Sequence, residues 1–234
     1  MQNQMDTNVL GVIYSYIFVV STIVIAFIIS RWTNASSEFI RKFVHILVSN
    51  WWFIYAYYFT DVVYSIVVPV TFIIANAAAT FLNWTDLLRL TERVRNYGLI
   101  YFPISLTILS ILHSYSYIPK YSVGIGILSM GYGDGLAALL GRKFGKNRIK
   151  AVNCAKSYQG SSAMFLSTLV VVLLFECHYN LCDGLIERSI KACIIALVTT
   201  VAEIFTPKGL DNISVPMVAA FLSTILLVPA SLIE

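Results

Sequence analysis

Long apolar runs, separated by short polar segments, limit what this chain can fold into more than any other feature. A helix that crosses a bilayer needs about 20 mostly apolar residues, and eight stretches reach or approach that length. Because these stretches are continuous rather than alternating, they predict helices instead of strands. The prediction is an all-α, polytopic transmembrane helical bundle of about 7–8 spans. The predicted spans are Val9–Ser30, Phe39–Phe59, Val62–Leu82, Leu99–His113, Ile118–Gly141, Ser161–His178, Ile190–Thr206 and Ile213–Ile233.

The composition supports a membrane location for the whole chain. Of its 234 residues, 58% are hydrophobic and only 12% are charged, and the mean hydropathy is +0.78. Soluble domains carry about 25% charged residues, because their surfaces must be covered with polar groups. A bilayer removes that requirement. We therefore expect a single integral membrane domain over residues 1–234, with no separate soluble domain.

The lysines and arginines are divided unevenly between the two sides of the predicted bundle. Cytoplasmic loops of membrane proteins carry an excess of these residues. With the N-terminus outside, all but three of the 16 lie on the cytoplasmic side, and Lys120, Arg188 and Lys191 lie outside. Topology and anionic ligands then explain the net charge of +4 better than nucleic acid does. We expect the N-terminus outside and the active site on the cytoplasmic face.

A first polar motif lies at the start of the second predicted span. Glu38, Arg41, Lys42 and His45 follow the spacing i, i+3, i+4 and i+7, which places them on one helix face. A basic membrane anchor with an i,i+3 ion pair would explain the two cations. It would not explain His45, which lies a turn deeper. This face is therefore a candidate for function.

A second motif, Gly131–Lys146, places Asp134 inside an apolar run. An acid there costs a few kcal/mol on insertion scales, so it is a functional candidate by default. Gly133 and Gly135 let a ligand or a backbone approach closely, and tight helix packing explains the glycines equally well. The cations that follow suit a polyphosphate, although topology alone could also account for them. They are Arg142, Lys143, Lys146 and Lys156, the last followed by Ser157.

A third motif begins at Asp211 and Asn212 and continues to Pro216. The simplest interpretation is a helix start, since Asp and Asn are good N-caps and the first turn of a helix tolerates Pro. A carboxylate beside a carboxamide also offers the oxygen ligands that Mg²⁺ accepts. Glu203 precedes the motif and needs a partner, for which Lys208 or a metal is available.

Aromatic residues are concentrated late in the second predicted span. Trp51, Trp52, Tyr55, Tyr57 and Tyr58 could form an interfacial belt or line a groove for an apolar acceptor. We favour the belt.

The motifs together resemble those of the CTP-dependent lipid-alcohol kinases: phytol kinase, dolichol (polyprenol) kinase and CTP-dependent diacylglycerol kinase. Phosphatidate cytidylyltransferases are more distant relatives. Glu38–His45 is similar to E-x-x-R-K-x-x-H, Gly133–Gly145 to a G-D-G…G-R-K-F-G pattern, Lys156–Ser161 to K-S-x-x-G-S, and Asp211–Pro216 to D-N-x-[ST]-x-P. Many relatives carry a second acid where this chain has Leu210, which leaves open how many carboxylates hold metal there.

The resemblance implies an enzyme that transfers phosphate from CTP, with Mg²⁺, to a membrane lipid alcohol. Phytol or another prenol or polyprenol is favoured as the acceptor, and diacylglycerol also fits. The implied catalytic residues are Glu38, His45 and Asp134. Asp134, Asp211 and Asn212 would hold metal. The nucleotide and phosphate contacts would come from Arg41, Lys42, Gly133, Gly135, Arg142, Lys143, Lys146, Lys156 and Ser157.

Two other functions remain open at this point. A phosphatidate cytidylyltransferase would use the same nucleotide but release pyrophosphate and a CDP-lipid. A small-solute or ion transporter would account for the intramembrane acids Asp134 and Glu203. Against a transporter, the polar motifs gather at one face and no inverted repeat is evident. The oligomeric state is not predicted.

Overall fold

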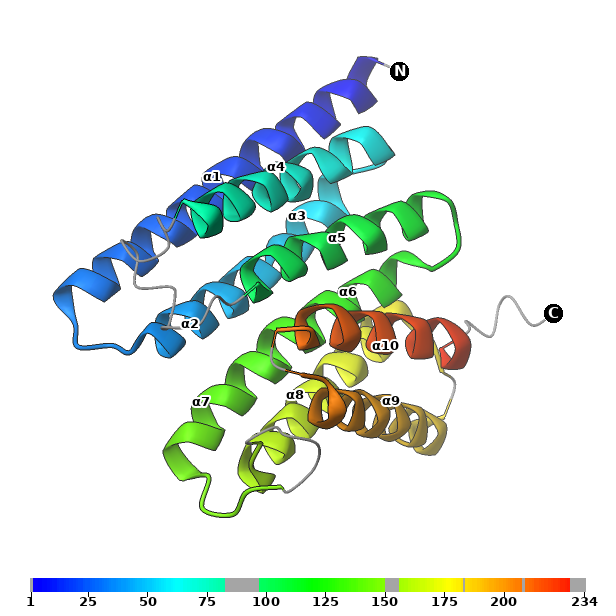
Figure 1. Ribbon diagram of the computed structural model, residues 1–234. Helices are drawn as coiled ribbons and strands as arrows, with labels where there is room; N and C mark the ends of the chain where they lie inside the picture. The colour runs from blue at the N-terminus through cyan, green and yellow to red at the C-terminus, as the bar shows by residue number, and fades with distance from the viewer. Residues whose placement is uncertain (1, 83–96, 150–155, 183, 208, 228–234) are drawn as a thin grey trace.

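The computed structural model describes residues 2–82, 97–149, 156–182, 184–207 and 209–227, and helices joined by short loops make up this part of the chain (Figure 1). The predicted all-α class is confirmed. Within the described residues, β pairing is limited to an isolated bridge between Arg148 and Ser157. The elements are α1 (Gln2–Trp32), α2 (Ser37–Ser49), α3 (Trp51–Tyr58), α4 (Val62–Phe81), α5 (Gly98–Ser114), α6 (Lys120–Leu128), the π-helical η2 (Ser129–Asp134), α7 (Gly135–Phe144), α8 (Tyr158–Tyr179), α9 (Leu185–Phe205) and α10 (Asp211–Leu226).

Four helices in the described part of the chain are long and apolar enough to cross a membrane. They are Gln4–Trp32, Val62–Phe81, the continuous Lys120–Phe144 and Tyr158–Tyr179. The helices α5 and α10 are apolar but shorter. Length and composition therefore support a membrane protein, but they do not confirm the predicted count of 7–8 spans.

The second predicted span is not one straight helix, because it breaks at Asn50 between α2 and α3. The Asn50 side-chain amide donates to the carbonyls of Ile46 and Leu47, at 2.8 and 3.2 Å. Its Oδ1 accepts a hydrogen bond of 2.9 Å from the Tyr132 hydroxyl. Local side-chain bonding of this kind competes with the helical ladder, and here a contact from η2 holds it in place.

The aromatic residues of α3 lie mainly in the core. Trp51, Trp52 and Tyr55 are only 1%, 2% and 1% exposed, and the Trp51 indole donates to Ser15 at 2.8 Å. The predicted interfacial belt is therefore wrong for these three residues. Tyr57, at 76% exposure, does face outward.

The helix ends that carry the polar motifs meet on one side of the bundle. In Figure 1, α1 and α7 end at the left, where α2 begins. The helices α9 and α10 run antiparallel, so that the end of one and the start of the other lie together (Figure 1). The packing of α8 against α7 and α9, and of α10 against α6 and α9, connects these ends.

Candidate active site

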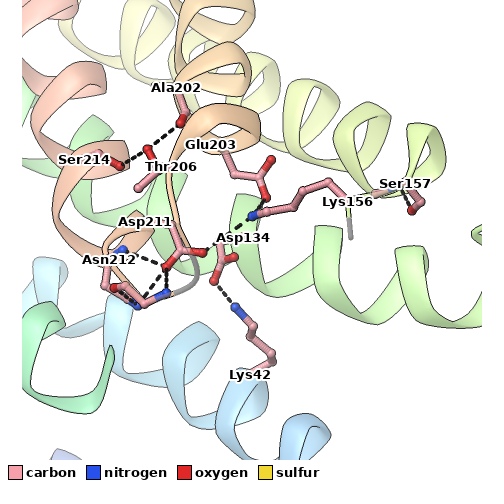
Figure 2. Close-up of polar contacts among 12 residues, drawn as sticks. Lys42, Asp134, Lys156, Ser157, Ala202, Glu203, Thr206, Asp211, Asn212 and Ser214 are labelled. Carbon is pink, nitrogen blue, oxygen red and sulfur yellow. Dashed lines mark hydrogen bonds and ion pairs between the residues drawn. The ribbon is translucent and has the colours of Figure 1, made fainter. Parts of the chain in front are cut away.

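A polar cavity of about 840 Å³ lies where these helix ends meet. Its walls come from α2, η2 and α7, the start of α8, and the junction between α9 and α10. The structure thus brings the three polar motifs together in one site (Figure 2). Its charged lining residues are Glu38, Arg41, Lys42, Asp134, Arg142, Arg148, Lys156, Glu203 and Asp211, joined by His45, Ser157 and Asn212.

The helix α2 directs one polar face into this cavity. Its N-cap, Ser36, accepts a 3.3 Å hydrogen bond from the Phe39 backbone N–H, so the helix begins just before Glu38. Arg41, Lys42 and His45 are buried on this helix despite their polarity. Glu38 pairs with Arg142 of α7 at 3.0 Å rather than with a cation of its own helix. The face therefore lines the cavity and is not a simple surface anchor.

Asp134 ends the π-helical segment and forms a buried ion pair with Lys42 (Figure 2). The side chains of the two residues are 3% and 8% exposed. A Cβ atom on Gly131 would overlap Ser49, so that glycine allows η2 to approach α2 closely. Short π-helical turns often occur at functional sites. Here the turn and the close approach place Asp134 beside Lys42.

Lys156 lies immediately before α8 and connects two acids. It pairs with Glu203 of α9 and, at 3.6 Å, with Asp211 of α10. Burial alone would lower the pKa of the Lys156 ammonium, but Glu203 and Asp211 outweigh burial and raise that pKa above its ordinary value. Lys156 is therefore charged throughout the neutral range. The next residue, Ser157, caps α8 by accepting the Gly160 N–H at 3.1 Å.

The turn before α10 fixes the third motif. Gly209 has a φ of 99°, a left-handed conformation that glycine adopts without strain. One oxygen of Asp211 accepts the backbone N–H groups of Gly209 and Asn212, at 3.0 and 3.1 Å. The Asn212 side-chain amide donates to the Gly209 carbonyl at 2.8 Å. A helix does begin at Asp211, but its N-cap is Leu210 rather than the predicted Asp or Asn. The side chains of Asp211 and Asn212 also line the cavity.

The donor chemistry of this corner fits a magnesium ion. Asp134 and Asp211 supply carboxylates, and the buried Oδ1 of Asn212 has no hydrogen-bond partner among the described residues. Hard oxygen donors of this kind suit Mg²⁺. In the described residues, no group of three or more His, Cys, Asp or Glu side chains lies close enough to hold a metal ion by itself. Any magnesium here would therefore depend on substrate phosphates or water for its remaining ligands.

Four residues predicted to contact the nucleotide lie outside the lining. A Cβ atom on Gly133 would lie 2.5 Å from the Met164 sulfur, and one on Gly135 would lie 2.5 Å from Cγ1 of Ile46. These two glycines therefore serve helix packing in this structure. Lys143 and Lys146 are exposed and are not part of the cavity wall.

Two charged lining residues, Arg148 and Glu203, do not belong to the site predicted from the sequence. Arg148 follows α7, and only its position in a basic loop could have indicated it. For Glu203 the sequence predicts only a need for a partner, and the structure pairs it with Lys156. Lys208, the partner suggested by the sequence, lies outside the described residues, as do Arg89, Arg93, Arg95 and Lys150.

Comparison with known proteins agrees with the resemblance seen in the motifs. The chain is 30% identical over 128 residues to a phytol kinase of Synechocystis, a match that covers 55% of this chain and 54% of that protein. It is 31% identical to the dolichol kinase of Schizosaccharomyces pombe, over 40% of this chain and 17% of that one. It is 34% identical to phytol kinase 1 of Arabidopsis thaliana, over 42% of this chain and 36% of that one.

The predicted relationship to the phytol and dolichol kinases is thus confirmed by sequence similarity. The chain spans about half the length of the Synechocystis relative that it matches, and a smaller share of the other two. No family model matches the chain. No solved structure matches it either.

Proposed function

We propose that this protein is a CTP-dependent kinase of a membrane lipid alcohol, with phytol or another prenol or polyprenol as the favoured acceptor. The observation that carries the proposal is the cavity in which Lys42, Asp134 and Lys156 meet, at the ends of apolar helices. Five cations and four acids line it, which suits a magnesium-bound polyphosphate. The similarity to phytol and dolichol kinases supports the same reaction.

The proposed reaction is a single phosphoryl transfer. The alcohol oxygen forms a bond to the γ-phosphorus of CTP, and the bond from that phosphorus to the β,γ-bridging oxygen breaks. The products are a lipid phosphate and CDP, and the hydroxyl proton passes to a base in the site. Such transfers depend mostly on positioning and charge neutralisation.

The phosphates would be held by cations that reach the cavity from three segments. Arg41 and Lys42 come from α2, Arg142 from α7, and Lys156 from the start of α8. Lys143 and Lys146 are exposed outside the cavity wall, so they would only attract the nucleotide electrostatically as it approaches. Asp134, Asp211 and Asn212 would hold Mg²⁺, which when bound neutralises charge on the phosphates.

The proton acceptor is proposed to be His45 rather than Glu38. Glu38 already pairs with Arg142 at 3.0 Å. His45 is 4% exposed, and its Nδ1 has no hydrogen-bond partner among the described residues. A neutral imidazole in that position could accept or steer a hydroxyl proton.

We further propose that the site faces the cytoplasm and that the N-terminus lies outside. Charge asymmetry between the predicted loops supports this orientation. Up to eight crossings of a single domain are compatible with it, if α5, α9, α10 and the α2–α3 pair cross together with the four long helices. CTP would then arrive from water and the alcohol from the lipid.

The test uses the purified protein, radiolabelled CTP and a panel of lipid alcohols. We expect the wild type to release CDP and a lipid phosphate, and both Asp134→Asn and Asp211→Ala to lose transfer. Glu187→Gln, a change to an acid whose side chain is 52% exposed in the first turn of α9, is the matched control and should keep full activity. Release of pyrophosphate and a CDP-lipid would show a cytidylyltransferase instead. Solute uptake into proteoliposomes without CTP turnover would favour a transporter.

A further inference from the structure

A second cavity, of about 390 Å³, lies next to the polar one and is almost wholly apolar. It is enclosed by α1, α2, α3, α4 and α5, and its walls include Val19, Ala26, Val68 and Leu106. These four side chains are only 2–5% exposed. Cavities of about 300–1,000 Å³ with such walls are typical of small-molecule sites. This space is therefore large enough to hold a ligand.

The polar groups of this wall are few, and most are already bonded. The Asn76 amide donates to the Leu99 carbonyl at 2.8 Å, and the Trp51 indole donates to Ser15. The remaining polar side chain is His45, whose buried Nδ1 has no partner among the described residues. The ring of His45 stacks on Phe102 at 5.2 Å between centroids. A ligand of this cavity would thus be a hydrocarbon with one polar end.

His45 also lines the polar cavity, so the two spaces share this residue. It follows Arg41 and Lys42 on α2, and Lys42 pairs with Asp134. A hydroxyl beside the imidazole would therefore lie at the boundary between the hydrocarbon space and the proposed phosphate site. The lining residues of α4 run from Val68 to Ala79, or about 16 Å at about 1.5 Å per residue. Asn76 bonds to Leu99, whose neighbour Gly98 lines the polar cavity, so the apolar cavity extends from the polar one toward Val68.

We propose that this apolar cavity holds the hydrocarbon chain of the acceptor alcohol, with the hydroxyl beside His45. The inference rests on the proposed kinase function and specifies how its acceptor is bound. The occupant is one chain of an isoprenoid type, because the volume is near the lower end of ligand sites and leaves no room for two long acyl chains. Phe27 lines the cavity yet is 37% exposed, so a longer chain would leave the bundle beside it.

The experiment compares a pair of matched substitutions on α4. Ala79 lines the cavity, whereas Ala75, one turn earlier, is exposed and does not. In the full-length protein, Ala79→Phe should raise KM for a long-chain prenol about tenfold or more, since each buried methylene contributes about fourfold. KM for CTP should stay within about twofold. Ala75→Phe should behave as wild type with every alcohol. Ala26→Phe, from the opposite wall, should reproduce the effect of Ala79→Phe.

A second measurement separates failure of the inference from failure of the proposed function. A long-chain alcohol carrying a diazirine is photolysed with the wild type, and the labelled peptides are identified. We expect labels on α1, α4 and α5, reduced by Ala79→Phe but not by Ala75→Phe. If the wild type transfers phosphate and the two variants are indistinguishable with all alcohols, the cavity proposal is overturned and the kinase remains. If no alcohol is phosphorylated but labelling follows the cavity, the kinase proposal is overturned and the binding site remains.

Discussion

Lys42 and Asp134 form a buried ion pair across 92 positions of sequence, and this pair connects α2 to the π-helical segment. Each residue lies in a separate motif, and each motif alone has a simple structural explanation. The contact between them joins the cationic face of α2 to an acid that lies within an apolar helix. It also makes this part of the protein sensitive to the loss of either charge.

The first prediction separates the structural and catalytic parts of this pair. Lys42→Met and Asp134→Asn should each destabilise the protein by about 3–5 kcal/mol, because each leaves one buried group without its partner. The double variant should recover much of that loss, since no unpaired charge remains. All three should lack phosphoryl transfer. Thermal unfolding in detergent and CTP turnover measure the two effects, and simple addition of the two stability losses would contradict the prediction.

The second prediction concerns Lys156 and pH. Its folded-state pKa is raised above the unfolded value by Glu203 and Asp211, which outweigh the effect of burial. The stabilisation from this lysine is therefore fully present below the unfolded pKa and is lost as pH rises through the folded pKa. We expect no contribution to pH dependence near neutrality, and a decline in stability only at alkaline pH. Melting temperatures of wild type and Lys156→Met across pH should converge at the alkaline end.

A companion variant tests the same cluster. Lys156→Met leaves Glu203 and Asp211 facing each other without a cation, so the variant should be less stable than wild type at neutral pH. Adding Glu203→Gln should restore part of the loss, because it removes one of the two acids. No recovery in the double variant would show that Lys156 acts through packing alone.

Much of the site could be predicted from the sequence because its residues stand out locally. Asp134 interrupts an apolar run, and Arg41, Lys42 and His45 share one face of a helix by spacing alone. Their common side follows from charge asymmetry in the loops. These features can be read from local spacing or from the number of lysines and arginines in each loop. The structure places all four residues in one cavity.

Other features depend on contacts between distant segments, which spacing does not encode. Glu203 pairs with Lys156, which lies 47 positions earlier in the sequence. The break at Asn50 depends on a hydrogen bond from Tyr132. The burial of Trp51 and Trp52 depends on how α3 packs in the bundle. The apolar cavity is the clearest case, since its walls come from five helices whose residues look like ordinary lipid-facing or core positions.

The third prediction tests the close approach of η2 to α2. Gly131→Ala would place a methyl group against Ser49, and overpacking of this kind costs about 1–3 kcal/mol. Overpacking would push η2 away from α2 and displace Asp134 relative to Lys42, so CTP turnover should fall as well. Gly184→Ala is the control, since the nearest atom to its Cβ lies 4.0 Å away. Adding Ser49→Gly to Gly131→Ala should return part of the stability, and failure to do so would assign the glycine another role.

The fourth prediction concerns the two sides of the bundle. Tyr117 lies just before the continuous helix Lys120–Phe144, and Lys143 lies at its other end. The 25 residues of this helix extend about 37 Å, more than the hydrocarbon core of about 30 Å. In a cysteine-free background, Trp32→Cys and Lys143→Cys should react with an impermeant maleimide from one side of sealed vesicles, and Tyr117→Cys from the other. Trp32 and Tyr117 are 85% and 72% exposed, and Lys143 is also exposed, so all three are accessible to the reagent. Labelling of Trp32→Cys and Lys143→Cys from opposite sides would place α2 and α7 at different faces, and a shared phosphate site could not form.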